Sequence, residues 1–346
     1  MNGNKENLGT ENKCPLCFSK KVKVIRAISS MEASEFINKR QSGEFLHQMS
    51  RYIEDVIWRQ ETSYFMNCLN CSLEYSFPFK AADKNIYNII YDESSIDDDF
   101  WNWDFQEAYE IIKKKIINVG NKDFKILELG SGSGHFIKKI SKNLIPPTSC
   151  YITEYSDNCR NAISNLGIHS YGDIQELDKA IFNSSFDFIC MFQLLEHIDN
   201  LYDLINDLGC LAKKDALIII TVPNSYQRIF YDRNYIFEDI PPIHISRFNV
   251  LSFNKIAEIM NWVMKYYKVE QSSKKEKLKR FLYLEYMRFP FFNFFEKKFF
   301  KSLKTLRKPF LFVIFLIIAV VKVKSIFELI FCKNLGTSQF VVFQKD

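Results

Sequence analysis

The chain has 346 residues, 47% of them apolar, which is enough for one large or two modest domains with a real hydrophobic core. Its net charge of +5 is unevenly placed: residues 274–308 hold 12 basic side chains against 3 acidic ones, so the rest of the chain carries a net charge of −4. Basic character therefore belongs to one segment, and we expect no nucleic-acid partner for the fold as a whole. The polar first 13 residues show no apolar run, which predicts no secretory signal, and the nine cysteines then favour metal or core roles over disulfides.

Two pairs of cysteines follow a polar tail at residues 1–12, which we expect to be disordered. The pairs are Cys14-x-x-Cys17 and, after 50 intervening residues, Cys68-x-x-Cys71. Four thiolates are the tetrahedral set that zinc prefers, and such a closed site is structural. Strand-like sequence flanks both pairs, and helical periodicity fills the gap between them. Residues 13–95 are therefore predicted to form a zinc-ribbon-like segment with a helical insertion; the alternative is four unrelated core cysteines.

An apolar strand runs into a glycine-rich turn and then a helix at residues 125–136. The glycines Gly130, Gly132 and Gly134 allow a sharp turn and a close approach of the backbone to a ligand. A strand, turn and helix of this kind open a doubly wound α/β domain. A dinucleotide-binding loop would have a third glycine where this chain has His135, and Glu128 lies inside the strand. Both features disfavour an NAD-dependent dehydrogenase.

Further strands alternate with helices along the chain, and polar residues stand where the strands end. Strands are predicted at 149–155, 169–173, 186–193, 216–222, 264–269 and 339–344. In open α/β sheets, ligands bind at the carboxyl ends of the strands. Glu154, 20 residues beyond Gly134, is placed to accept hydrogen bonds from ribose hydroxyls. Asp173 is placed to accept from an adenine amino group, Ile174 to pack on the purine, and Gln193 ends the fourth strand.

These features together resemble the class I S-adenosylmethionine (SAM)-dependent methyltransferases. The E-x-G-x-G-x-G pattern at 128–134 matches their first motif, and the later motifs follow in order: Glu154, Gly172-Asp173, Leu195-Glu196-His197 and Val222-Pro223-Asn224. With the cysteine pairs and the segment 241–248, the chain looks like a bacterial subgroup with an N-terminal zinc-binding segment. That subgroup is common in surface-polysaccharide and natural-product pathways. It usually has two histidines after the Pro-Pro pair, but here the first is Ile243, so only His244 carries over.

The resemblance implies a Rossmann-like sheet of seven strands, built from a SAM-binding core at 96–270 and a last strand at 339–346. The residues expected to hold SAM are Glu128, Gly130, Gly132, Gly134, Glu154, Asp173, Ile174 and Gln193. The implied reaction is methyl transfer to a small-molecule or sugar acceptor, with O-methylation expected and C- or N-methylation open. A hydroxyl acceptor needs a general base, and His197 and His244 are the candidates because histidine titrates near neutral pH. A structural role is the alternative for each histidine.

A basic, aromatic insertion at 271–338 separates the last two strands, where methyltransferases have a short hairpin. Its apolar run at 309–321 has 13 residues, fewer than the roughly 20 that a spanning helix needs. A basic, aromatic, helical segment suits the membrane interface, so we expect a cytoplasmic protein that docks peripherally on the inner face of the membrane through 274–324. The alternatives are helices packed on the domain or on a second subunit, and RNA binding.

Two other functions compete with this prediction. One is a quinone or lipid methyltransferase, which stays within the same class. The other is a non-catalytic interaction protein, in which a zinc ribbon and amphipathic helices sit on a methyltransferase scaffold. The intact glycines and acids argue against a loss of catalysis.

Overall fold

The computed structural model describes residues 12–37, 43–90, 101–120, 123–233, 240–288, 315–318, 320–331 and 335–346. The contacts of the chain divide it into two compact units. The first unit comprises Met1–Pro223, Asp239–Lys268 and Ser338–Asp346, and the second comprises Asn224–Glu238 and Val269–Thr337. The predicted disordered tail at 1–12 lies outside the described residues except for Asn12.

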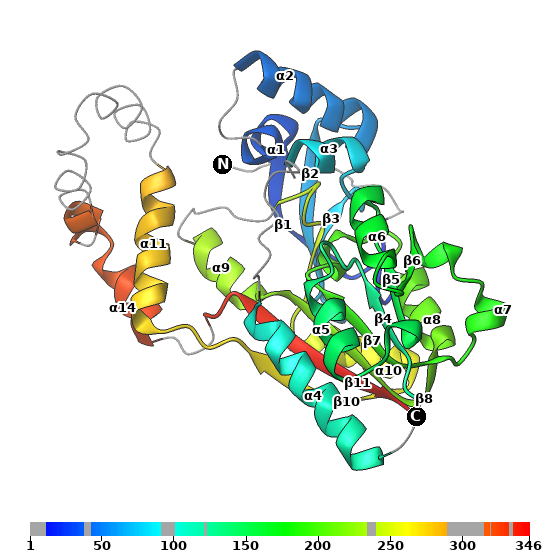
Figure 1. The fold of residues 1–346 in the computed structure, drawn as a ribbon. Helices are drawn as coiled ribbons and strands as arrows, with labels where there is room; N and C mark the ends of the chain where they lie inside the picture. The colour runs from blue at the N-terminus through cyan, green and yellow to red at the C-terminus, as the bar shows by residue number, and fades with distance from the viewer. Residues whose placement is uncertain are drawn as a thin grey trace, which may run out of the picture. The chain divides into compact units, whose positions relative to one another are not determined.

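A seven-stranded sheet forms the centre of the first unit. Its strands are β4 (Ile126–Leu129), β5 (Cys150–Thr153), β6 (His169–Tyr171), β7 (Phe186–Phe192), β8 (Ala212–Pro223), β10 (Trp262–Val269) and β11 (Ser338–Lys345). They lie in the order β10-β11-β8-β7-β4-β5-β6 (Figure 1). The pairs from β8 to β6 are parallel, and β11 runs antiparallel to β8. The predicted doubly wound α/β sheet is confirmed, and its strand order reverses between β4 and β7, where such sheets bind ligands.

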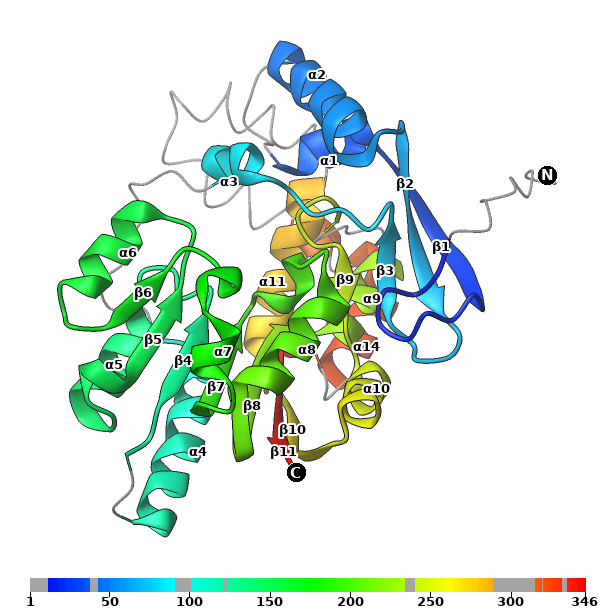
Figure 2. The same cartoon turned by 90° about the vertical axis from the view of Figure 1, so that its right-hand side faces the viewer.

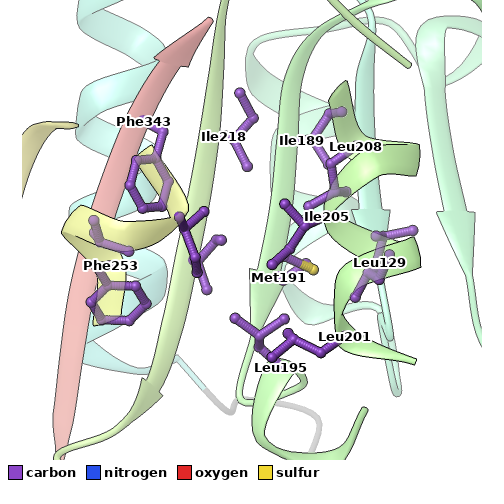
Figure 3. Close-up of a cluster of buried hydrophobic side chains, with 14 of the residues drawn as sticks. Leu129, Ile189, Met191, Leu195, Leu201, Ile205, Leu208, Ile218, Phe253 and Phe343 are labelled. Atoms are coloured by element: carbon purple, nitrogen blue, oxygen red, sulfur yellow. The ribbon is translucent and has the colours of Figure 1, made fainter. Parts of the chain in front are cut away.

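Helices cover both faces of this sheet. One face carries α4 (Trp103–Val119), α5 (His135–Asn143) and α6 (Asp157–Ser164), whose apolar side chains share one buried cluster with the sheet. The other face carries α8 (Leu201–Leu211) and α10 (Val250–Met260), which Figure 2 shows side by side in front of the strands. In Figure 3, Leu201, Ile205 and Leu208 point from α8 toward the strands, and Phe253 of α10 lies near Phe343 of β11. Strands buried on both faces explain the nearly unbroken apolar runs in the sequence.

The strand β8 begins four residues earlier than the predicted 216–222. Ala212 pairs with Phe186 of β7, and the Lys213 ammonium forms an ion pair with Asp187 at 2.7 Å. A prediction based on the run of apolar residues places the start of this strand too late, because residues 213–215 are polar. The short helices η3 (Ile174–Glu176) and η4 (Leu195–His197) follow the carboxyl ends of β6 and β7, whereas η2 (Pro147–Ser149) and α7 (Lys179–Phe182) precede β5 and β7.

A second sheet, of four strands, contains the N-terminal segment of the first unit. It is ordered β1-β2-β3-β9, from β1 (Val22–Ser29), β2 (Thr62–Cys68), β3 (Glu74–Phe77) and β9 (Ser246–Arg247). The helices of this region are α1 (Ser30–Ile37), α2 (Gly43–Tyr52), the π-helix η1 (Ile53–Trp58) and α3 (Lys84–Ile90). The helical insertion between the cysteine pairs agrees with its predicted periodicity. Strand β9 was not predicted, because two residues leave no period to recognise.

The second unit is helical where the structure describes it. It contains α9 (Ser225–Arg233), α11 (Lys274–Arg288) and α14 (Val323–Phe331). Phe230, Phe281, Leu329 and Leu335 form its small apolar cluster, and the Lys322 ammonium lies 3.3 Å from the buried Glu285 carboxylate. The whole of the predicted aromatic and apolar stretch at 289–314 lies outside the described residues. Among the described helices, none is long and apolar enough to cross a membrane.

One carboxyl group is buried inside the central sheet. Glu128 lies in β4 between Ile152 of β5 and Cys190 of β7, and it is 2% exposed. Burial, assisted by the negative charge of Glu154, raises the pKa of Glu128 from 4.5 to about 8. The folded chain therefore keeps a proton on Glu128 at neutral pH, whereas the unfolded chain releases it above pH 4.5.

We expect the Glu128→Gln substitution to stabilise the chain increasingly as the pH rises from 4.5 to 8. Over this range the unfolded wild type binds fewer protons at this site than the folded one, so its free energy of unfolding falls, whereas glutamine has no proton to lose. Calorimetric melting should show equal Tm values near pH 4.5 and a variant Tm higher by about 2 °C or more at pH 8.

The exposed Glu110 of α4 provides the matched control, because Glu110→Gln removes a carboxylate that water already solvates. Its Tm difference from the wild type should not change across the same pH range. A Glu128→Gln difference that stays constant with pH would show that the buried carboxyl does not hold its proton.

Candidate functional site

The glycine-rich turn after β4 has a backbone conformation that residues other than glycine rarely adopt. The φ angles of Gly130, Gly132 and Gly134 are +66°, +55° and +74°. A Cβ on Gly134 would come within 2.6 Å of Ile163 of α6, so this glycine lets a helix pack closely. A Cβ on Gly132 would meet nothing within 4 Å, which leaves its backbone open on one side. The turn is therefore tightly packed against α6 at Gly134 and open to a ligand at Gly132.

The carboxylate of Glu154 lies at this turn. One of its oxygens accepts a hydrogen bond from the Gly132 amide at 2.7 Å, and the other accepts from the Ser156 amide at 2.9 Å. The pairing of Leu129 with Thr153 places the next residue of each strand at the same edge of the sheet. The structure thus brings together Glu154 and the glycines, which the sequence analysis associated by spacing alone.

Asp173 and Ile174 follow β6, the neighbouring strand. The Asp173 carboxylate accepts hydrogen bonds from the Gln175 amide at 2.9 Å and from the Tyr155 hydroxyl at 2.6 Å. The Ile174 side chain is buried in the apolar cluster of the α8 face. Tyr155 was not singled out from the sequence, although its position directly after Glu154 is a signal that could have found it. Glu154, Tyr155 and Asp173 form one polar edge.

Gln193 directly follows β7 and has a left-handed backbone conformation, at a φ of +51°. Its side-chain amide lies 3.4 Å from the Thr221 hydroxyl and 3.3 Å from the Ser338 hydroxyl. The Thr221 hydroxyl in turn donates to the buried Asp104 carboxylate of α4 at 3.0 Å, and burial raises the pKa of Asp104. Asp104 has no distinctive signal in the sequence, because an acid in the first turn of a helix is ordinarily a favourable charge at the helix N-terminus.

Two histidines and a carboxylate meet just beyond β7. The rings of His197 and His244 lie 4.5 Å apart, edge to face, and Nε2 of His197 is 3.9 Å from the Glu196 carboxylate. One ligand atom from each of these residues lies within 4.8 Å of the others. Leu194, two residues before Glu196, lies 3.0 Å from the position that a Cβ on Gly130 would take. The loop after β7, which carries Glu196 and His197, therefore borders the glycine turn.

The backbone fixes the tautomer of His197. Its Nδ1 lies 2.7 Å from the Ile243 carbonyl oxygen, and the Tyr87 hydroxyl is 2.9 Å from the same nitrogen. A carbonyl only accepts hydrogen bonds, so Nδ1 carries the proton and Nε2 keeps its lone pair. Burial and the neighbouring His244 lower the pKa of His197 to about 3. His197 is therefore neutral at physiological pH.

The N-terminal sheet holds the loop that carries His244. Strand β9 pairs with β3 through Ser246–Tyr75 and Arg247–Glu74, and the Ser76 amide donates to the Ile245 carbonyl at 2.8 Å. Arg247 is buried, with its guanidinium 3.6 Å from the Glu74 carboxylate. Its role is therefore structural within this sheet. His244 and Arg247 are three residues apart, so the pairing also restrains the histidine.

The four N-terminal cysteines converge as predicted. The Cys14 and Cys71 sulfurs are 3.6 Å apart, as are those of Cys17 and Cys68, and all four lie within 4.8 Å of one another. A tetrahedron of thiolates at zinc–sulfur distances of about 2.3 Å has edges of about 3.8 Å. The spacing of the sulfurs therefore fits a zinc ion. Cys14, Cys68 and Cys71 also belong to the apolar cluster that underlies α8 and α10.

Comparisons with known proteins identify the family of the chain. A family model described as a methyltransferase domain matches residues 100–303, which is more than half of the chain. No curated protein sequence matches the chain.

Several solved structures are similar to the chain at low identity. A SAM-dependent methyltransferase from Archaeoglobus fulgidus is 14% identical, with a TM-score of 0.43 over 70% of this chain and 94% of that one. One from Mesorhizobium loti is 8% identical, with a TM-score of 0.41 over 69% and 97%. Phosphoethanolamine N-methyltransferase 2 from Haemonchus contortus, in complex with SAM, is 15% identical, with a TM-score of 0.36 over 69% and 52%.

The family model spans the glycine turn, the polar edge at Glu154 and the histidine cluster, all on a mostly parallel seven-stranded sheet. The chain belongs to the methyltransferase-domain family and is a class I SAM-dependent methyltransferase.

Proposed function

We propose that this methyltransferase methylates a hydroxyl group of a small-molecule or sugar acceptor, in a surface-glycan or secondary-metabolite pathway. The observation that carries the proposal is the pair of histidines, His197 and His244, beside the glycine turn. A hydroxyl is a poor nucleophile until its proton is removed, and two adjacent imidazoles with a carboxylate are suited to that task. The pathway rests on the resemblance to the subgroup with two cysteine pairs.

Several groups support SAM binding at the polar edge. The open backbone at Gly132 and the Glu154 carboxylate beside it suit the methionine and ribose parts of the cofactor, and Asp173 suits the adenine amino group. Within the described residues, one oxygen of Glu128 and the Ser131 hydroxyl are buried without a hydrogen-bond partner, which a polar ligand at this turn would relieve. When bound, SAM supplies a methyl group that its sulfonium has already activated. The protein then has mainly to align the acceptor with it.

The acceptor side is assigned to the ends of β7 and β8. Gln193, held by Thr221 and Ser338, borders the cofactor, and both histidines are half-buried. His197 is a weak free base, because its pKa is about 3, so we assign it to orienting its neighbours. His244 is assigned to the acceptor proton. Lipid and quinone acceptors stay as the alternative within the same reaction class.

The Glu154→Ala substitution is expected to weaken the binding of S-adenosylhomocysteine at least about tenfold, because it removes the acceptor for both ribose hydroxyls. Isothermal titration of the full chain measures this directly. Glu176→Ala, which removes another carboxylate bonded to a backbone amide at this edge, is the matched control and should bind nearly as the wild type does.

The same preparation, supplied with methyl-labelled SAM and a panel of sugars and nucleotide sugars, tests the acceptor. We expect label on an oxygen of one acceptor, identified by mass spectrometry. Label on carbon or nitrogen would contradict O-methylation. A folded wild type that does not bind S-adenosylhomocysteine would favour the non-catalytic scaffold.

We infer that the four N-terminal cysteines hold a structural zinc ion. The sulfur spacing supports this, and four protein ligands leave no open position for chemistry. Because three of the cysteines lie in the apolar cluster beneath α8 and α10, the ion would stabilise the core of the first unit as well as the N-terminal sheet.

Elemental analysis of the purified chain is expected to find one zinc per molecule, and Cys68→Ser should lose it and lower the Tm by roughly 5 °C or more. Cys210→Ser is the control, because Cys210 is an exposed cysteine outside the cluster and should keep both zinc and Tm. Metal-free wild-type protein with four free thiols at these positions would contradict the inference of a structural zinc ion.

We infer that the second unit docks on the membrane. Val321, just before α14, is 71% exposed, and Phe327, within α14, is 64% exposed. Basic residues lie on the same unit, on α11 and α14. Exposed apolar side chains among lysines suit the interface of an anionic bilayer, and docking there would fit a lipid-linked acceptor.

The full chain should co-sediment with vesicles that contain an anionic phospholipid at low salt, and the Val321→Asp/Phe327→Asp variant should lose most of this binding. Ile181→Asp changes an equally exposed apolar residue of α7 in the first unit and should bind as the wild type does. Equal sedimentation of all three proteins, or none by the wild type, would contradict membrane docking.

A further inference from the structure

The cluster of Glu196, His197 and His244 has the composition of a metal site that is separate from the four cysteines. We propose that these three residues bind a divalent transition-metal ion at the acceptor side of the methyltransferase. Their ligand atoms lie within 4.8 Å of one another, so small side-chain movements bring them to metal–ligand distances of about 2.0–2.2 Å. Two imidazoles and one carboxylate are the ligands that zinc, iron, manganese and cobalt take in proteins.

The hydrogen bonds of His197 have the pattern of a metal ligand. Its Nδ1–H donates to the Ile243 carbonyl, so the lone pair of Nε2 is directed to the side of the ring where Glu196 lies. Ligating histidines almost always donate their other ring nitrogen to a carbonyl, carboxylate or water, which fixes the tautomer and the ring orientation. The Tyr87 hydroxyl, close to the same nitrogen, restrains the ring from the other side.

Backbone bonds hold the three ligands together from segments far apart in sequence. The Ile245 amide donates to the Glu196 carbonyl at 3.0 Å, which joins the loop of His244 to the end of β7. The His244 amide lies 3.3 Å from the Ile240 carbonyl, and β9 pairs with β3 directly after it. Glu196 is buried, and the histidines are half-buried. A rigid, partly buried ligand set of this kind needs little ordering when an ion binds.

Three protein ligands leave coordination positions for an acceptor oxygen. An ion at this place would lower the pKa of a bound acceptor hydroxyl, whose proton passes to water. The oxygen then attacks the methyl carbon, and the carbon–sulfur bond breaks to leave the neutral thioether. This part of the inference rests on the proposed function. In it the ion that His244 helps to hold activates the hydroxyl and water takes the proton, in place of His244 acting as the base. Whether the ion binds does not depend on that function.

Manganese(II) is the probe that separates this site from the cysteines. It prefers oxygen and imidazole ligands, whereas the four thiolates prefer zinc. The full chain, with its zinc retained, is titrated with Mn²⁺, and free Mn²⁺ is followed by electron paramagnetic resonance. We expect one bound ion per chain, and a loss of affinity of at least about tenfold in each of Glu196→Gln and His244→Asn. The exposed His169 provides the control, since His169→Asn should bind Mn²⁺ as the wild type does.

Melting curves and S-adenosylhomocysteine titration accompany each variant. A folded wild type that binds no Mn²⁺ up to about 1 mM, or variants that bind it as the wild type does, would overturn the metal site. Loss of S-adenosylhomocysteine binding with Mn²⁺ binding retained would instead count against the proposed function alone. Because His244 is half-buried and Glu196 is buried, His244→Asn keeps the test valid if Glu196→Gln does not fold.

Discussion

The pairing of β9 with β3 is the constraint on which the candidate site depends. The segment between β8 and α10 is a long connection, and such a loop has no fixed position unless other elements hold it. Two residues of it, Ser246 and Arg247, complete the N-terminal sheet, and the buried ion pair of Arg247 with Glu74 lies at the same place. His244 lies two residues before this pairing. The N-terminal segment therefore positions a candidate catalytic residue rather than forming a separate attachment.

The reversal of strand order at β4 supplies the second half of the site. The helix after β4 covers one face of the sheet and the helix after β7 covers the other, so the chain leaves the two strands toward opposite faces. Open α/β sheets bind ligands at such a point. Gly130 and Leu194 approach each other there, and Glu154 arrives from β5. The polar edge at Glu154 and the loop that carries His197 follow from one topological feature, because both lie at this switch point.

The parts that the sequence predicts are those with a local or periodic signal. Buried parallel strands have unbroken apolar runs, the turn has its glycines, and the cysteines come in pairs, so the sheet and the convergence of Cys14, Cys17, Cys68 and Cys71 were foreseen. The meeting of His197 with His244, 47 positions apart, was not, because only the tertiary fold brings a loop back to the end of β7. Asp104 and Tyr87 were missed for the same reason: their partners lie on distant elements.

The first unit thus offers two ligand sets whose chemistry differs. Four sulfurs form one set, and a carboxylate with two imidazoles forms the other. Soft thiolates bind zinc tightly and close its coordination shell, whereas the mixed set is harder and has only three ligands. Different metal ions would therefore prefer different sets because of the ligand type, however close the two sets lie. The closed set suits the stability of the shared apolar cluster, and the open one suits contact with an acceptor. The N-terminal segment contacts both, because it supplies the four cysteines and because its strand β3 pairs with β9, next to His244.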